Sequence, residues 1–365
     1  MTRRAPSDRL SEGWERGFAP GPARLLSVVG GGYRGLLGTR DWLYARGVLK
    51  SRTLGLPVVS VGNLTVGGTG KTPAVELAVQ TLLELGQRPA IVSRGYGRRS
   101  GGIQIVADTA SIRLDAEDAG DEPFLLARRL PGVPVVVGGN RYDAARRAVE
   151  RFGVTAIVLD DGFQHRTLGK SLEIVMVRAH QPWGNGRLLP AGPLREPLTA
   201  LRKADLVVAT GAAGPDELAR VTAVIRRHAA EVPVVGGAYV PTECWETASM
   251  RPVEPSHLSG LRLLAFAGIG SPASFERTLR EVGVGLAEMR VFVDHHWYSQ
   301  ADLVDLGGRA AALGAQGMIT TEKDWVRLRR LPPSSLPLYV LSVRLALVAG
   351  QAAWRAALEL ACAPR

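Results

Sequence analysis

The stretch from Val58 to Pro73, VVSVGNLTVGGTGKTP, constrains the fold of this chain more than any other. An apolar run leads into a glycine-rich loop and then into Lys71-Thr72 and an amphipathic segment, the strand, loop and helix order of a phosphate-binding P-loop. Glycines suit this loop because its backbone N–H groups must point inward at phosphate oxygens, in conformations that leave no room for Cβ atoms. The stretch predicts a nucleotide site in an α/β protein.

Each end of this loop has an expected role. Lys71 would carry a positive charge to the β- and γ-phosphates, Thr72 would bind Mg²⁺, and the following helix adds its positive N-terminal end. The loop departs from the general pattern G-x-x-x-x-G-K-[ST] at Thr65, where that pattern has glycine. We expect the nucleotide phosphates to be bound by eight residues: Thr65, Val66, Gly67, Gly68, Thr69, Gly70, Lys71 and Thr72.

A second signal is the run from Ala156 to Asp161, an apolar strand that ends in two carboxylates. The ends of parallel strands converge on the ligand crevice, and a P-loop enzyme holds Mg²⁺ there. We predict Asp160 as a metal ligand and Asp161 as its partner.

Two further stretches leave alternatives open. In Gly120-Asp-Glu-Pro123, Asp121 is well placed to cap a helix with Pro123 in its first turn, and a capping carboxylate at the mouth of a nucleotide site can also act as a base. In the loop from Arg94 to Arg99, arginines around Tyr96 can hold a phosphorylated or planar ligand, or form a solvated basic loop.

Composition limits the class of protein. The chain has 365 residues, 46% of them hydrophobic and 22% charged, which is typical of a globular protein of two domains. Its formal net charge of +11 predicts attraction to a polyanionic partner. The two cysteines, Cys244 and Cys362, lie far apart and suggest neither a disulfide framework nor a metal cluster.

The first 52 residues mix arginines with tryptophans, tyrosines and leucines. Such a segment suits a helix that lies in a membrane interface, and it equally suits a helix packed on the protein with its charges in water. No run of 18 or more apolar residues occurs, so we expect no membrane span.

Alternating strand and helix patterns predict a P-loop NTPase-like, doubly wound sheet with a second, smaller α/β domain. We divide the chain into a basic, aromatic N-terminal segment, a P-loop core, a linker with short strands and a smaller C-terminal α/β domain: 1–52, 53–212, 213–260 and 261–365. The active site is expected in the cleft between the two domains.

Seven blocks of the sequence, in family order and covering roughly residues 20 to 345, together resemble the tetraacyldisaccharide 4'-kinase family. The blocks are SVGNLTVGGTGKTP (60–73), SRGYGR (93–98), GDEP (120–123), LDDGFQHR (159–166), LLPAGPLREP (188–197), DHHWY (294–298) and TEKD (321–324). Thr65 is acceptable in this family's version of the P-loop.

The resemblance implies transfer of the γ-phosphate of ATP, with Mg²⁺, to the 4'-hydroxyl of a tetraacylated glucosamine disaccharide 1-phosphate in lipid A biosynthesis. It implies a peripheral enzyme on the cytoplasmic face of the inner membrane. Asp121 resembles the family's base and His295 the histidine paired with it, although spacing alone favours a surface histidine before a helix. Arg195 and Glu196 would bind substrate or stabilise charge, and Tyr96 would contact nucleotide or substrate.

Other readings rank lower. A regulatory GTPase should carry an Asn/Thr-Lys-x-Asp motif, and Thr321-Glu-Lys-Asp324 has the wrong spacing. A partitioning-type ATPase needs a lysine where Val66 stands. A nucleic-acid-binding protein could use the positive charge, but no helix-turn-helix, zinc or RNA-recognition signature accompanies it, so no nucleic-acid partner is expected.

Overall fold

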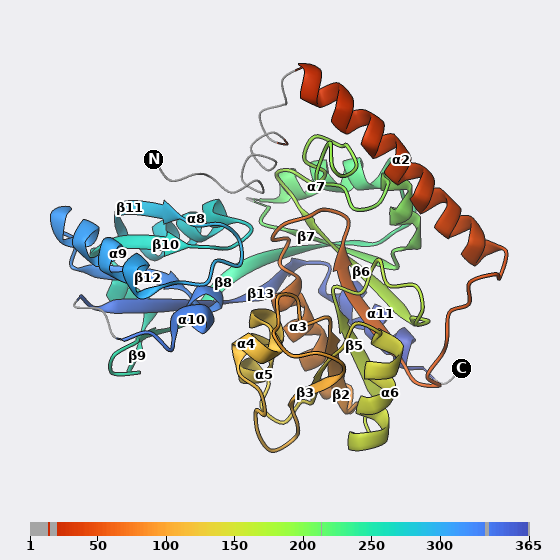
Figure 1. Ribbon diagram of the computed structural model, residues 1–365, viewed down its shortest axis with the longest axis horizontal. Coiled ribbons are helices and arrows are strands. Elements are labelled where there is room, and N and C mark those ends of the chain that lie inside the picture. The colour runs from red at the N-terminus through yellow and green to blue at the C-terminus, as the bar shows by residue number, and fades with distance from the viewer. Residues whose placement is uncertain (1–13, 15–19, 213, 333–335, 364–365) are drawn as a thin grey trace.

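The computed structural model describes Trp14 and residues 20–212, 214–332 and 336–363, and it forms two lobes joined by long strands (Figure 1). The thirteen strands within these described ranges form one sheet in the order β11-β10-β12-β13-β8-β7-β6-β1-β5-β2-β4-β3, with β9 paired to β8. The predicted doubly wound α/β fold with a second, smaller α/β unit is confirmed.

The larger lobe is built on a mostly parallel sheet, in which the edge strand β3 is antiparallel to β4. Its strands are β1 (Val58–Asn63), β2 (Pro89–Ser93), β3 (Gln104–Ala107), β4 (Val135–Val137), β5 (Ala156–Asp160), β6 (Leu172–Arg178) and β7 (Leu206–Thr210). Its helices are α2 (Pro20–Ala45), α3 (Lys71–Glu84), α4 (Ala116–Ala119), α5 (Asp121–Arg129), α6 (Arg141–Phe152), a 3₁₀ turn (Leu198–Lys203) and α7 (Pro215–Arg226).

Successive side chains of the buried strands point to opposite faces of this sheet, and both faces are apolar, which explains why helices cover both of them. In β1, Val59 and Val61 face the cluster that contains α3, whereas Val58 faces the cluster that contains α6. All three side chains are at most 1% exposed. Because β1 is central and buried on both faces, the loop that follows it has a fixed starting point.

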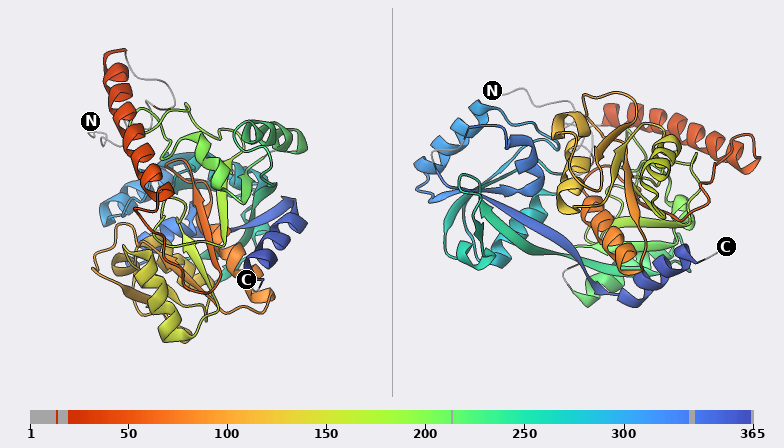
Figure 2. Two further views of the ribbon diagram at one scale, coloured as in Figure 1. Left: turned by 90° about the vertical axis from the view of Figure 1, so that its right-hand side faces the viewer. Right: turned by 90° about the horizontal axis from the view of Figure 1, so that it is seen from below.

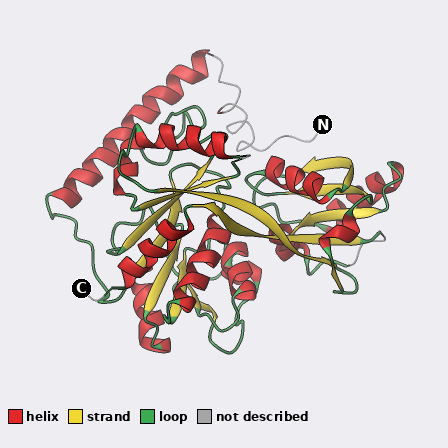
Figure 3. Ribbon diagram, turned by 180° about the vertical axis from the view of Figure 1, so that it is seen from behind, coloured by secondary structure: helices red, strands yellow, loops and turns green. Residues whose placement is uncertain are grey.

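The smaller lobe continues the sheet through two long strands, β8 (Val234–Glu246) and β13 (Leu338–Ala349), which are antiparallel (Figure 3). It contains β9 (Pro252–Val253), β10 (Arg262–Ala267), β11 (Gly285–Val291), β12 (Gly317–Thr321), a 3₁₀ turn (Pro255–Leu258), α8 (Pro272–Val282), α9 (Gln300–Ala312) and α10 (Glu322–Leu328). The last helix, α11 (Gln351–Cys362), follows β13.

The structure differs from the predicted division of the chain in two places. The segment 213–260 is not a linker of short strands, since it holds α7, which packs on β7, and the thirteen-residue β8. The segment 261–365 is not one unit, because α11 returns to the larger lobe, where Trp354 and Leu358 are buried and the Trp354 indole donates to Thr81 Oγ1 at 3.0 Å. An amphipathic helix at the chain end does not reveal which lobe it covers.

The N-terminal segment 1–52 lies partly outside the described residues. Helix α2 runs along the outside of the larger lobe (Figure 2) and touches the loop around residues 188–196. There the Tyr33 hydroxyl donates to Arg195 O at 2.9 Å, and Arg40 Nη2 donates to Glu196 Oε1 at 2.7 Å. The side chains of Val28 and Leu36 are 74% and 72% exposed, so much of the apolar surface of α2 remains uncovered by this chain.

Candidate active site

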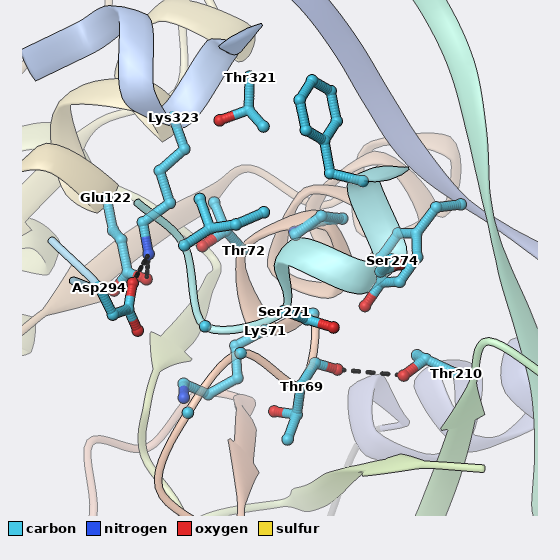
Figure 4. A pocket seen from close by; sticks show the side chains of 18 of the residues that line it. Thr69, Lys71, Thr72, Glu122, Thr210, Ser271, Ser274, Asp294, Thr321 and Lys323 are labelled. Atoms are coloured by element: carbon cyan, nitrogen blue, oxygen red, sulfur yellow. Dashed lines mark hydrogen bonds and ion pairs between the residues drawn. The ribbon is translucent and has the colours of Figure 1, made fainter. Parts of the chain in front are cut away.

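A cavity of about 680 Å³ lies where the two lobes meet. The larger lobe contributes the P-loop from Val66 to Thr72, and the smaller lobe contributes Asp294, His295 and Lys323. Figure 4 shows Lys71 and Thr72 together with Asp294 and Lys323. Thr65 lies outside this lining among the described residues. It is only 4% exposed and bridges to Leu194, so it anchors the loop rather than facing the cavity.

The P-loop glycines are required by backbone conformation and by close neighbours. Gly67 and Gly70 have φ angles of 102° and 85°, in the region that L-residues avoid. A Cβ on Gly70 would lie 2.0 Å from Tyr239 Oη, on β8. The loop is further held by Asn63 Nδ2, which donates to Thr69 Oγ1 at 2.9 Å. Since α3 starts at Lys71, the loop amides and the positive helix end both face the cavity, the arrangement that binds phosphate.

The carboxylate of Asp161 pairs with two cationic side chains, Arg195 and Lys71. Arg195 donates to both carboxylate oxygens, at 2.9 and 3.0 Å, and Lys71 Nζ lies 3.6 Å from Oδ1. Burial acts against ionisation, but Lys71 and Arg195 hold the pKa of Asp161 down at about 2. The predicted metal role of Asp161 would require this arrangement to change.

Asp160, at the end of β5, has the features of a cation ligand. Its Oδ2 accepts from Ser93 Oγ at 2.8 Å, while its buried Oδ1 has no hydrogen-bond partner among the described residues. Burial, together with the charges of Glu122 and Asp161, raises the pKa of Asp160 to about 7. A cation beside it would relieve that repulsion and satisfy the orphaned oxygen.

These groups fit Mg²⁺. Within the described ranges no cluster of three His, Cys, Asp or Glu side chains forms a closed metal site. Mg²⁺ in kinases takes only one or two carboxylates, with phosphate oxygens and water completing its shell. Thr72 and Glu122 line the same cavity as Asp160. Glu122 was not among the predicted site residues, although it directly follows Asp121.

The predicted pair of Asp121 and His295 is brought together from opposite lobes. His295 Nδ1 lies 2.8 Å from Asp121 Oδ2, across 174 residues of sequence. Burial would raise the pKa of Asp121, but the His295 hydrogen bond and the charge of Lys323 hold it well below its ordinary value. His295 lines the cavity, whereas Asp121 is 4% exposed and lies behind it. Tyr96 packs near the imidazole, with ring centroids 5.6 Å apart.

The same pair is held from the smaller lobe by Arg327. Its Nη1 donates to Asp121 Oδ2 at 3.3 Å, and its Nη2 donates to Gly268 O at 2.8 Å and to Asp324. Gly268 O also accepts from the His295 backbone N–H at 3.1 Å. Asp324 is fully buried in these bonds, so it cannot read a nucleotide base, which argues further against a GTPase.

Cations gather beside the two aspartates on the larger lobe. Arg141, at the start of α6, is 5% exposed, and its charge acts on Asp160, Asp161 and Arg94. Burial and the charges of Arg141, Lys170 and Arg94 lower the pKa of His165 to about 4. Arg141 and His165 lie outside the cavity lining given by the described residues, whereas Arg94 and Arg195 line the cavity itself and suit an anionic ligand.

Residues 22–362 match the family of tetraacyldisaccharide-1-P 4'-kinases. The chain belongs to this family. Tetraacyldisaccharide 4'-kinase from Syntrophus aciditrophicus is 41% identical over 357 residues, covering 93% of this chain and 94% of the relative. Its counterpart from Anaeromyxobacter dehalogenans (strain 2CP-C) is 44% identical over 316 residues, covering 85% and 83%. LpxK from Aquifex aeolicus, solved in complex with ATP, has a TM-score of 0.74 at 29% identity and covers 93% of this chain and 99% of that one.

In this kinase, Arg195 and Glu196 point in different directions. Arg195 lines the cavity, whereas Glu196 is 2% exposed, lies outside the lining and pairs with Arg40 of α2. The geometry therefore gives Glu196 a place in docking α2 rather than in contacting a ligand in this cavity.

None of the helices in the described part of the kinase combines the length and apolar character needed to span a bilayer.

Sequence reasoning missed Glu122, Arg141 and Arg327 at the site. The first is adjacent to a predicted residue and could have been found, whereas the other two are single arginines with no local signal.

Proposed function

We propose that this kinase transfers the γ-phosphoryl group of ATP to the 4'-hydroxyl of a tetraacylated glucosamine disaccharide 1-phosphate. The observation that carries the proposal is that one cavity joins a P-loop on the larger lobe to the Asp121–His295 pair, whose histidine comes from the smaller lobe. Family membership supplies the identity of donor and acceptor.

The P-loop amides and Lys71 would hold the triphosphate, as the helix start at Lys71 supports. Thr72, Asp160 and Glu122 would hold Mg²⁺, which supplies charge neutralisation on the phosphates. Asp161 would keep Lys71 and Arg195 in place beside them.

The Asp121–His295 pair would act as the base. Asp121 accepts from Nδ1 and lies behind the ring, which leaves Nε2 as the nitrogen that a hydroxyl in the cavity would meet first. A loose phosphoryl-transfer transition state needs positioning more than strong basicity, so an aspartate with a lowered pKa is compatible with this role.

An anionic acceptor would lie beside Arg94, which lines the cavity, with Tyr96 next to the imidazole. The exposed Val28 and Leu36 on α2 support a further proposal, that the kinase works as a peripheral protein at a membrane surface, on the cytoplasmic face of the inner membrane. Replacing both with Asp should reduce cosedimentation with anionic vesicles, and unchanged binding would refute this role for α2.

The test of the reaction is transfer of labelled γ-phosphate from ATP to the tetraacyl disaccharide 1-phosphate in detergent micelles. We expect product with the wild type and none with Lys71→Ala, while Arg330→Ala, a surface arginine outside the cavity, serves as the matched control. ATP hydrolysis without lipid product would refute the proposed acceptor.

A further inference from the structure

Lys323, in the TEKD block, lines the cavity from the smaller lobe. It sits in the first turn of α10 on the smaller lobe. Its Nζ donates to Glu122 Oε1 at 2.9 Å and lies 4.0 Å from Asp294 Oδ1, and Figure 4 shows the side chain descending between these two carboxylates.

Lys323 joins the two lobes at the cavity, since it belongs to the smaller lobe and its partner Glu122 belongs to the larger lobe. Its partner Glu122 feels the charges of both Lys71, on the P-loop, and His295, in the proposed base pair. The Lys323 charge in turn acts on Asp121. Lys71, His295 and Lys323 all line one cavity, so a phosphoryl group that moves from a nucleotide on the P-loop to a hydroxyl beside His295 would move within the cavity that Lys323 enters.

Lys323 is held as one half of an ion pair, with its Nζ 2.9 Å from Glu122 Oε1 and its side chain 20% exposed. A charged hydrogen-bond donor that is held in place in a partly enclosed cavity can stabilise the negative charge that develops in a transition state.

We propose that Lys323 is a catalytic residue that pairs with the transferring phosphoryl group, supplied by the smaller lobe opposite Lys71. This inference rests on the proposed function. In the step, the bond from γ-phosphorus to the bridging oxygen breaks, its electrons stay with ADP, and a bond forms to the acceptor oxygen. The hydroxyl proton goes to the Asp121–His295 pair, and Lys323 keeps its own protons.

Glu122 holds Lys323 in the present arrangement, and Glu122 is also a fitting ligand for Mg²⁺. A cation on Glu122 would weaken its bond to Lys323 and free the ammonium group to turn toward phosphate oxygens. The alternative is that Lys323 only clamps the two lobes together. Arg330 is a control for that alternative, because it joins the lobes through Asp115 but lies outside the cavity.

The experiment compares the full-length wild type with Lys323→Met, Lys323→Gln and Arg330→Met. We expect kcat to fall roughly 100- to 1,000-fold in both Lys323 variants, with little change in the KM for ATP. Gln retains a hydrogen-bond donor toward Glu122 but no charge, so it should preserve the clamp without restoring turnover. Arg330→Met should retain the wild-type kcat.

A second readout does not depend on turnover. Binding of ADP with Mg²⁺ and aluminium fluoride, which mimics the phosphoryl group in flight, should weaken about 100-fold in Lys323→Gln, while binding of ADP with Mg²⁺ changes less than about threefold. Recovery of kcat in Lys323→Gln, or equal losses for the two ligands, would overturn the catalytic role. A wild type that fails to phosphorylate the lipid would instead count against the proposed function itself.

Discussion

The contact between Gly70 and Tyr239 allows a quantitative prediction about the P-loop. Gly70 and Gly67 both have positive φ angles, of 85° and 102°, so alanine at either position costs about 1–2 kcal/mol of backbone strain. A Cβ on Gly67 meets nothing closer than 4.0 Å, whereas a Cβ on Gly70 would lie 2.0 Å from Tyr239 Oη. The two substitutions thus share the strain and differ in the clash.

Relieving that clash requires movement of a side chain whose hydroxyl is packed against the loop. Overpacking of this kind costs about 1–3 kcal/mol, so Gly70→Ala should destabilise the protein by that amount beyond Gly67→Ala. The entropy that alanine removes from the unfolded chain is the same in both variants and cancels.

The assay is urea-induced unfolding of both variants, alone and combined with Tyr239→Phe, which removes the nearest atom and leaves Cζ at 2.9 Å. We expect the cost of Gly70→Ala to fall by about 1 kcal/mol in the Tyr239→Phe background and that of Gly67→Ala to stay constant. Equal destabilisation by the two alanines, or no coupling to Tyr239, would refute the reasoning.

Three further substitutions test other parts of the structure. Arg129→Leu leaves the buried Glu322 and the 12% exposed Glu76 without their cation, and should reduce the free energy of unfolding by about 3–5 kcal/mol, part of which Glu322→Gln should restore. The pKa of His165 is about 4 in the folded protein and 6.5 in its ordinary setting, so the unfolded state binds more protons between these pH values. The free energy of unfolding of the wild type therefore rises with pH across that window. His165→Gln should remove this pH dependence of stability. Arg40→Ala removes the nearest cation of buried Glu196 and should loosen the contact of α2 with the larger lobe. We therefore expect a protease to cleave α2 about tenfold faster in this variant.

Each of these has a clear contrary outcome. Loss of less than about 1 kcal/mol in Arg129→Leu would mean that the two carboxylates find other partners. A difference between wild type and His165→Gln that stays constant from pH 4 to 6.5 would contradict the lowered pKa. Unchanged cleavage of α2 in Arg40→Ala would show that other contacts hold the helix.

Local patterns predicted those parts of the fold that depend on neighbouring residues. The start of β1 at Val58, the start of α3 at Lys71 and the end of β5 at Asp160 all agree with the sequence, because a buried apolar run and a glycine loop determine them. Strand β6, Leu172–Arg178, was not predicted, although its central residues are buried. Asp121 was predicted to cap α5, but the cap is Gly120, and the carboxylate is used between the lobes instead.

The site was harder to predict because it is assembled across the sequence. Nothing local indicates that His295 meets Asp121, and only the resemblance to a family paired them. Arg327 is buried beneath both, three residues beyond the TEKD block in α10, where no local pattern marks it as part of the site. Contacts of this kind follow from the approach of two lobes, which neither periodicity nor spacing encodes.

The return of α11 to the larger lobe has a consequence for the order in which the protein folds on the ribosome. Trp354 and Leu358 of α11 pack against the helix that follows the P-loop, α3, where the Trp354 indole meets Thr81. The smaller lobe is complete in sequence earlier, since its strands lie between β8 and β13. During synthesis this part of α3 therefore stays uncovered until α11 emerges, and a chain that lacks Trp354 and Leu358 should pack α3 less firmly while it keeps every residue of the P-loop.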